Sequence, residues 1–232
     1  MNEFLNIARD INYKNIVKDL NENGFSTLGR LRSASLLSSA IKEIDNLSTF
    51  DDVEKNYSDS EHRTWNAHNK MSIAREFKFF SDEIISNVLN KNSYAYDILA
   101  IRNKALNDLD KKNVSLRWHM DSFFSQLKTF LFISEVHLDN GPFEIIPKTH
   151  KMSFKLRLAF KANFFKIKNL KDGKRGYSSI DHKTISSVLN INRKIETMTV
   201  PAGTIVLANT SCLHRAKPCI DGSRYALTSY YN

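Results

Sequence analysis

A change of pattern near residue 93 constrains the fold of this chain most strongly. Before it lie long amphipathic stretches. After it come short runs of β-branched and aromatic residues, separated by Gly, Pro, Asn and Asp. Runs of this kind predict strands joined by turns. Helices followed by strands favour an α+β, mainly β chain, in which a sandwich or jelly roll follows an N-terminal helical part.

The N-terminal part, residues 1–92, is predicted to be mainly helical. Ile16, Val17 and Leu20 have the spacing of one helix face, and Gly24 follows as a helix stop. A run of apolar residues from Leu36 to Ile44 repeats at helical spacing in the same way. The predicted elements are helices over about 13–20, 33–47 and 72–89, and a short strand over 25–28.

The C-terminal part, residues 93–232, is predicted to hold the β core. Residues about 151–195 lack strand signals and are predicted to form a partly helical insertion between two strands. We expect the whole chain, 1–232, to form one domain, since a β sandwich or barrel of 232 residues is common. The predicted strands are 94–101, 127–136, 143–146, 197–200, 204–208 and 225–231.

Composition excludes several classes of protein. A hydrophobic content of 41% and a charged content of 25% are those of an ordinary globular chain rather than a disordered one. Two cysteines, Cys212 and Cys219, are too few for a disulfide scaffold and favour a reducing compartment. The chain opens with mixed polar residues and contains no apolar run near the roughly 20 residues of a membrane span. We therefore expect a cytoplasmic protein without a membrane span.

The net charge of +9 is concentrated in one segment. Residues 148–194 contain ten Lys and three Arg against two Asp. Such an excess favours an anionic partner, such as a phosphorylated or carboxylated substrate, nucleic acid or a membrane surface. A solvated basic surface on a Lys-rich protein explains the same excess equally well.

His119 and Asp121 form a His-x-Asp motif. In an extended chain residues i and i+2 point to the same side, so an imidazole and a carboxylate can reach one cation. Two histidines and one carboxylate on one face of a metal form the site of non-haem Fe(II) oxygenases. His214, just after an apolar run, is the candidate for the second histidine. Taken singly, each of these residues is more often an ordinary surface or loop residue.

Arg224 lies ten residues after His214, at the start of the last predicted strand. A guanidinium that points inward from a strand requires an anion, because an unpaired buried charge is very costly. The fork of the guanidinium fits a carboxylate with two hydrogen bonds. A surface arginine is the alternative explanation.

The order of these motifs resembles the phytanoyl-CoA dioxygenase-like family of Fe(II)/2-oxoglutarate oxygenases. In that family a turn usually reads close to Asn-Gly-Pro-Leu-x-x-x-Pro-Gly-Ser-His, and here Lys148 and Thr149 replace its Gly and Ser. The resemblance covers most of the chain and is weakest over 45–92 and 151–195. The matching stretches are Asp19 to Phe25, Trp118-His119-Met120-Asp121, Asn140 to Lys151, Pro201-Ala202-Gly203-Thr204, His214, Arg224 and Tyr230-Tyr231.

The resemblance implies a double-stranded β-helix, a cupin-like jelly roll, with iron near one mouth. It implies His119, Asp121 and His214 as ligands of Fe(II). It also implies that the far carboxylate of 2-oxoglutarate pairs with Arg224, and Thr129 is our candidate for an assisting hydroxyl. Members of the family use O₂ and release succinate and CO₂ while oxidising a substrate C–H bond. Related halogenases have a small residue at the position of Asp121, so the carboxylate argues against halogenation.

Three functions remain open from the sequence. The first is hydroxylation of a small or medium-sized, anionic metabolite. The second is the same cofactor chemistry with desaturation, epimerisation or cyclisation as its outcome. The third is a non-catalytic binding module that uses its basic face, although no basic groove interleaved with aromatic residues supports nucleic acid as a partner.

Three further residues have two interpretations each, and a fourth has a structural one. His62, Trp65 and His68 either line a substrate pocket or pack on the barrel as loop residues, and packing is the commoner case. Cys212 lies two residues before His214 and is best explained as a small buried hydrophobic residue.

Overall fold

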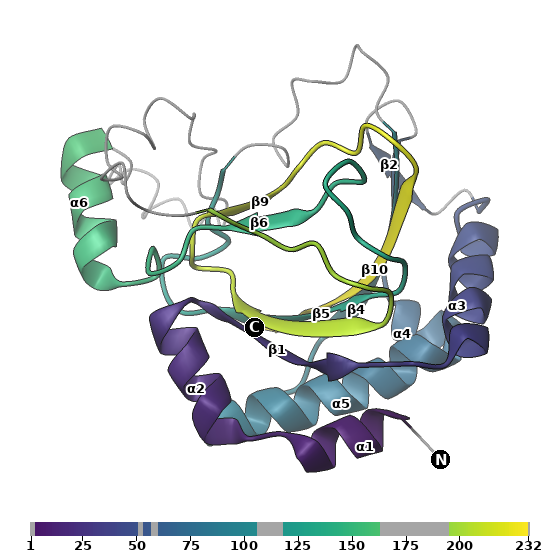
Figure 1. Ribbon diagram of the computed structural model, residues 1–232, viewed down its shortest axis with the longest axis horizontal. Coiled ribbons are helices and arrows are strands. Elements are labelled where there is room, and N and C mark those ends of the chain that lie inside the picture. The colour runs from purple at the N-terminus through teal and green to yellow at the C-terminus, as the bar shows by residue number, and fades with distance from the viewer. Residues whose placement is uncertain (1–2, 51–52, 57–59, 106–117, 163–194, 232) are drawn as a thin grey trace.

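The computed structural model describes residues 3–50, 53–56, 60–105, 118–162 and 195–231 (Figure 1). Two antiparallel sheets face each other, one of seven strands and one of three (Figure 1). The large sheet contains β1 (Phe25–Arg30), β2 (Glu54–Asn56), β3 (Glu61–Thr64), β4 (Asp97–Lys104), β5 (Leu127–Phe132), β8 (Thr204–Asn209) and β10 (Ser223–Tyr230). The small sheet contains β6 (Phe143–Ile145), β7 (Glu196–Thr197) and β9 (His214–Ala216).

The strand order identifies the architecture. The large sheet runs β1-β8-β5-β10-β4-β3-β2 and the small sheet β7-β6-β9, so most neighbours in space are distant in sequence. Antiparallel strands that cross between two facing sheets in this way form a jelly roll. The α+β, jelly-roll fold predicted from the sequence is therefore confirmed.

Six helices surround the described part of the sheets: α1 (Glu3–Asp10), α2 (Tyr13–Glu22), α3 (Ala34–Leu47), α4 (Ala67–Lys70), α5 (Ser72–Leu89) and α6 (Met152–Ala162). In Figure 1, α1, α2 and α5 lie along the outer face of the large sheet. Phe77, Phe80 and Ile84 of α5 belong to the same buried cluster as Leu127 and Leu131 of β5. Burial of this apolar surface attaches the helices to the sheet.

The ends of the predicted helices are determined by local chemistry. The hydroxyl of Ser33 accepts a hydrogen bond from the backbone N–H of Leu36 (3.3 Å) and caps α3. Gly24 adopts a φ of +90°, and its N–H donates to the Leu20 carbonyl at the end of α2. α5 ends at Leu89, and the residue that caps it, Asn90, is also left-handed. The three predicted helices and these ends therefore agree with the sequence to within two residues.

β5 separates the two sides of the large sheet. Leu127, Thr129 and Leu131 face the helices, whereas Lys128 and Phe130 face the small sheet. This alternation follows from the two-residue repeat of a strand. One strand therefore contributes to the apolar core on one side and to the interior of the jelly roll on the other.

Some elements differ from the predictions. β5 ends at Phe132 rather than at 136, because the N–H groups of Ile133 and Ser134 both turn to the Tyr225 carbonyl. The β2–β3 hairpin was missed because β3 is polar on both faces. β9, α1 and α4 were missed as well, because each is short.

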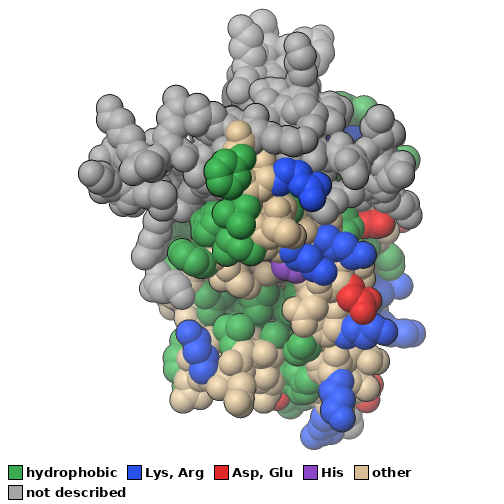
Figure 2. All heavy atoms as spheres, turned by 90° about the vertical axis from the view of Figure 1, so that its left-hand side faces the viewer, with side chains coloured by type: hydrophobic (Ala, Val, Ile, Leu, Met, Phe, Trp, Pro, Cys, Tyr) green, Lys and Arg blue, Asp and Glu red, His purple; other side chains and the backbone are tan. Residues whose placement is uncertain are grey.

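The predicted insertion over 151–195 is described only in part. Residues 152–162 form α6, and 163–194 lie outside the described residues. One side of α6 exposes Met152, Leu156 and Phe160, and Figure 2 shows hydrophobic side chains beside Lys and Arg on the face that carries this helix. The opposite side buries Phe154 and Leu158. Of the helices in the described ranges, none is long and apolar enough to cross a membrane.

Candidate metal centre

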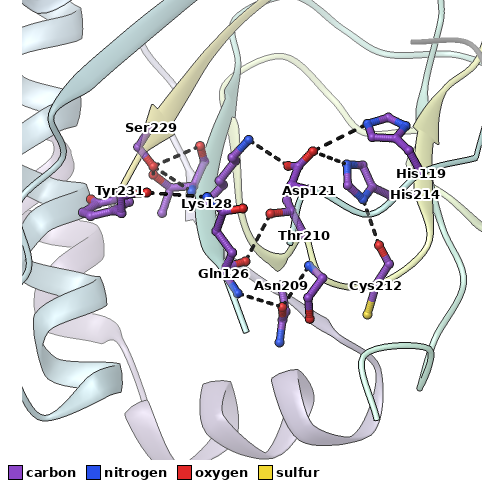
Figure 3. Close-up of polar contacts among 12 residues, drawn as sticks. His119, Asp121, Gln126, Lys128, Asn209, Thr210, Cys212, His214, Ser229 and Tyr231 are labelled. Atoms are coloured by element: carbon purple, nitrogen blue, oxygen red, sulfur yellow. Dashed lines mark hydrogen bonds and ion pairs between the residues drawn. The ribbon is translucent and has the colours of Figure 1, made fainter. Parts of the chain in front are cut away.

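Three side chains converge between the sheets. His119 and His214 form a bridge in which each backbone N–H donates to the other carbonyl at 3.0 Å. Asp121 lies two residues beyond His119, and its N–H donates to the Thr210 carbonyl (3.0 Å). The ligand atoms of the three side chains lie within 4.8 Å of one another (Figure 3). The structure thus brings together the three residues that the sequence selected.

The orientation of His214 is fixed by its own backbone. Its Nδ1 lies 2.9 Å from the Cys212 carbonyl, which can only accept a hydrogen bond. Nδ1 therefore carries the proton, and Nε2 is left with a free lone pair. That Nε2 lies 3.6 Å from Oδ1 of Asp121, and Nε2 of His119 lies 3.7 Å from the same oxygen. Nitrogen and oxygen lone pairs consequently face one point, as a metal ion requires.

Electrostatics keep His214 and Asp121 in the protonation states that bind metals. Burial lowers the pKa of His214 to about 4, so its imidazole is neutral at neutral pH. Burial alone would raise the pKa of Asp121, but His214, Lys128 and His119 together hold it well below its usual range. Neutral imidazole and ionised carboxylate are the forms that bind a transition metal.

A buried cation stands beside the three candidate ligands. Nζ of Lys128 donates to Oδ2 of Asp121 at 2.8 Å and lies 3.9 Å from the centre of the Tyr230 ring. Burial would lower the pKa of Lys128, but Tyr230 and Asp121 outweigh it and raise the pKa. Lys128 was not selected from the sequence, because a lysine within an apolar strand gives no local signal that it faces the interior.

The segments that carry the ligands are packed by α6. The apolar neighbours of the two histidines are Trp118, Met120 and Leu213. These three side chains are buried in one apolar cluster with Phe154 and Leu158 of α6. The guanidinium of Arg215 covers the Trp118 ring at 4.6 Å. The described part of the insertion therefore supports the candidate metal centre from outside.

A cavity of about 140 Å³ adjoins the three side chains. Its walls include the rings of Phe130, Phe132 and Phe143, together with Arg224 and Lys128. Alternate residues of β10, from Arg224 to Tyr230, face this space, as the strand repeat requires. An apolar chamber with a few cationic groups is suited to a small dianion.

Arg224 is buried at the wall of this chamber. Its Nη2 donates to Oδ1 of Asn103 (2.7 Å), and its Nη1 donates to the Gly141 carbonyl. Nε is buried and has no hydrogen-bond partner in the described ranges. Burial lowers the pKa of Arg224, although a guanidinium remains charged at neutral pH. An orphaned N–H on a buried cation fits the carboxylate of a bound ligand.

Thr129 requires a correction. Its hydroxyl lies 2.5 Å from Oγ of Ser81 on α5 and 2.7 Å from Oγ of Ser229, on the helix-facing side of β5. The prediction that Thr129 assists in binding 2-oxoglutarate is therefore contradicted, since its neighbour Lys128 faces the chamber instead. The strand repeat places only one of two adjacent residues on a given side.

His62, Trp65 and His68, for which the sequence left two interpretations open, pack on the barrel. Nδ1 of His62 lies 2.8 Å from Nη2 of Arg102, and His68 lies 3.8 Å from Asp97. The indole of Trp65 donates to Glu54 (2.9 Å). The alternate residues of β3, Glu61 and Arg63, line the chamber instead.

A larger cavity of about 590 Å³ lies beside Asp121, between α5 and the segment 121–127. Amide and hydroxyl side chains line it, including Asn92, Ser125 and Gln126. Among the described residues that line this cavity, Lys91 is the cationic one. Its volume falls in the range of small-molecule sites.

Comparison with known proteins agrees with this architecture. The family model described as phytanoyl-CoA dioxygenase (PhyH) matches residues 20–224. A comparison with curated proteins finds no match. Among solved structures, the non-haem α-ketoglutarate-dependent carbocyclase SnoK from nogalamycin biosynthesis is 14% identical, with a TM-score of 0.67 over 97% of this chain and 85% of that one.

Two further solved structures are similar. The epimerase SnoN, solved with Fe³⁺, α-ketoglutarate and nogalamycin RO, is 12% identical, with a TM-score of 0.68 over 94% of this chain and 82% of that one. EctD from S. alaskensis, solved with 2-oxoglutarate and 5-hydroxyectoine, is 16% identical, with a TM-score of 0.65 over 96% of this chain and 76% of that one. At these identities the likeness shows the fold, whereas the family match covers most of the chain. The chain therefore belongs to the phytanoyl-CoA dioxygenase (PhyH) family of iron- and 2-oxoglutarate-dependent oxygenases.

Proposed function

We propose that this protein hydroxylates a C–H bond of a small or medium-sized metabolite, with His119, Asp121 and His214 as the ligands of iron(II). Arg224 binds the distal carboxylate of 2-oxoglutarate. One observation carries the proposal: three ligand atoms within 4.8 Å of one another adjoin the chamber that Arg224 lines. When bound, iron and 2-oxoglutarate supply the oxidising chemistry.

The residues of the chain provide the geometry for this reaction. The His119–His214 bridge fixes the two imidazoles relative to each other, with ring centres 4.3 Å apart. The free Nε–H of Arg224 offers a second anchor away from the metal ligands. The rings of Phe130, Phe132 and Phe143 exclude water between these two points.

The substrate site is proposed at the 590 Å³ cavity beside Asp121. The basic excess of residues 148–194 supports an anionic substrate, and Lys91 provides a cation in the cavity itself. Of the basic residues on α6, Arg157 is exposed, whereas Lys155 is buried and donates to the Phe123 carbonyl. Reversing the charge at Lys91 should therefore weaken the binding of the true substrate more than reversing it at Arg157.

A second outcome has support of its own. Two of the similar structures are named a carbocyclase and an epimerase, so this fold also serves outcomes other than hydroxylation. The mass of the product separates the outcomes: hydroxylation adds one oxygen atom, desaturation or cyclisation removes two hydrogens, and epimerisation leaves the mass unchanged.

The first experiment is anaerobic addition of Fe(II) and 2-oxoglutarate to the metal-free protein, followed by visible absorption. A weak charge-transfer band is expected in the wild type, because chelated 2-oxoglutarate absorbs there. His119→Ala should abolish the band. Arg224→Ala should require about tenfold to a hundredfold more 2-oxoglutarate, since it removes a buried charged hydrogen bond worth about 1.5 to 3 kcal/mol.

Arg157→Ala is the matched control, because it removes an exposed arginine outside the chamber and should behave as the wild type. Absence of the band in the wild type at saturating iron would contradict the proposal. It would direct attention to the basic face and a binding role.

A further inference from the structure

We propose that Lys128 is a positioning residue that restricts Asp121 to binding the metal through one oxygen. This inference rests on the proposed role of Asp121 as an iron ligand. Lys128 would hold Oδ2, so that Oδ1 alone faces the metal. The coordination positions opposite the three ligands then stay open for 2-oxoglutarate and oxygen.

The two oxygens of Asp121 have different partners. Oδ1 is the oxygen near the imidazoles, at 3.6 Å from Nε2 of His214 and 3.7 Å from Nε2 of His119. Oδ2 is the oxygen that accepts the 2.8 Å hydrogen bond from Lys128 (Figure 3). A hydrogen bond between two charged groups is about twice as strong as a neutral one, so it resists rotation of the carboxylate.

Lys128 is itself held in place. It lies in β5, in the middle of the large sheet, where β8 and β10 flank it. Its side chain is 7% exposed and rests against the Tyr230 ring. The other carboxylate that lines the chamber, Glu61, lies 2.9 Å from Nε of Arg63. Lys128 therefore has Asp121 as its carboxylate partner among the described residues of the chamber.

The number of oxygens that Asp121 uses matters for the reaction. Two histidines and a carboxylate that uses one oxygen would leave positions on a bound metal open. 2-Oxoglutarate and oxygen would both need such positions. A second bond from Asp121 would occupy one of these positions. The positive charge of Lys128 would repel a divalent metal nearby. Raising the metal affinity therefore does not explain the Lys128–Asp121 pair, whereas orienting the carboxylate does.

The test uses Mn(II), which binds such sites and reports its coordinated waters through electron paramagnetic resonance. Water enriched in the magnetic isotope of oxygen broadens the Mn(II) lines in proportion to the number of bound waters. Lys128→Met should show one coordinated water fewer than the wild type, because Asp121 is then free to bind through both oxygens. It should also need more 2-oxoglutarate for half-saturation, because a second oxygen of Asp121 would compete for a position that 2-oxoglutarate requires.

Two further variants make the result specific. Lys128→Arg keeps a cationic donor, and the adjoining chamber of about 140 Å³ has room for its longer side chain, so the wild-type water count should return. Lys151→Met removes an exposed lysine near α6 and should change neither quantity. Should Lys128→Met fail to fold, Lys128→Leu replaces it, because it also removes the cationic donor and leaves both oxygens of Asp121 in place. It should show the same loss of one coordinated water, and a wild-type count in it would overturn the inference.

Each contrary result has a distinct meaning. An equal water count in the wild type and Lys128→Met overturns the positioning role. Weaker 2-oxoglutarate binding with that equal count would indicate that Lys128 contacts 2-oxoglutarate directly. Failure of Mn(II) to bind the wild type, or equal binding to His119→Ala, would instead contradict the proposed metal centre.

Discussion

Thr149 shows how a single hydroxyl supports the candidate metal centre. It is fully buried, its Oγ1–H donates to the Ile146 carbonyl (2.6 Å), and Oγ1 accepts the N–H of Leu213 (2.8 Å). Leu213 directly precedes His214. The family usually has Ser at this position, which supplies the same hydroxyl. Lys148 stands where the family usually has Gly and adopts a φ of +65°, which explains the common Gly.

Replacing Thr149 by Val should therefore disturb the position of His214. The change keeps the shape of the side chain but leaves the buried N–H of Leu213 without its acceptor. A loss of about 1 to 3 kcal/mol in the free energy of unfolding is expected. Urea unfolding and Mn(II) titration would measure stability and metal affinity, and both should fall.

Thr149→Ser is the control, because it keeps the hydroxyl and resembles the usual residue of the family. It should retain metal affinity close to that of the wild type. Equal metal affinities in the Val and Ser variants would show that this hydrogen bond does not position His214.

At the scale of elements, α6 connects the insertion to the ligand segments. Leu158 is fully buried and belongs to the cluster that contains Trp118, Met120 and Leu213. Leu156 lies two residues earlier on the same helix and is 49% exposed. The two leucines therefore differ in burial while sharing their helix.

Leu158→Ala should destabilise the protein by about 2 to 5 kcal/mol, because it removes buried apolar contacts and leaves a cavity. Leu156→Ala should change stability by no more than about 0.5 kcal/mol. Urea unfolding compares the two variants. Metal affinity, measured by Mn(II) titration of the folded protein, should fall only for Leu158→Ala. Similar losses of stability in both variants would contradict the packing described for α6.

At the scale of the whole molecule, metal binding should be coupled to stability. The candidate ligands come from β9 and from the segment around His119. His119 and His214 are 95 residues apart in sequence, so the unfolded chain does not hold them together. A metal that binds only the folded state stabilises it by about 2.7 kcal/mol at one hundred times its dissociation constant. For a chain of 232 residues this corresponds to a rise in Tm of about 5 to 10 °C.

Thermal unfolding with and without Mn(II) measures this rise. 2-Oxoglutarate should add a second rise only when metal is present, since it chelates the metal. His119→Ala should show neither effect. A rise of equal size in His119→Ala would place the bound metal at another site.

The sequence alone determined that a helical part precedes the strands, and it selected the candidate ligands. The three predicted helices and the strands β1, β8 and β10 follow from periodicity, because burial of one face imposes a repeat on consecutive residues. The strand predicted over 94–101 is found three residues later, as β4 (Asp97–Lys104). The motif around His119, together with His214 and Arg224, was selected from the order of motifs along the chain. These features depend on residues near one another in sequence or on the resemblance to a family.

Only the tertiary structure decided which groups meet inside the jelly roll. It placed Lys128 rather than Thr129 beside Asp121, because a shift of one residue along β5 exchanges the chamber for the helix-facing side. It also placed α6 behind Trp118, in a cluster that joins segments distant in sequence. Such contacts depend on how the two sheets and α6 pack, and no local pattern records that packing.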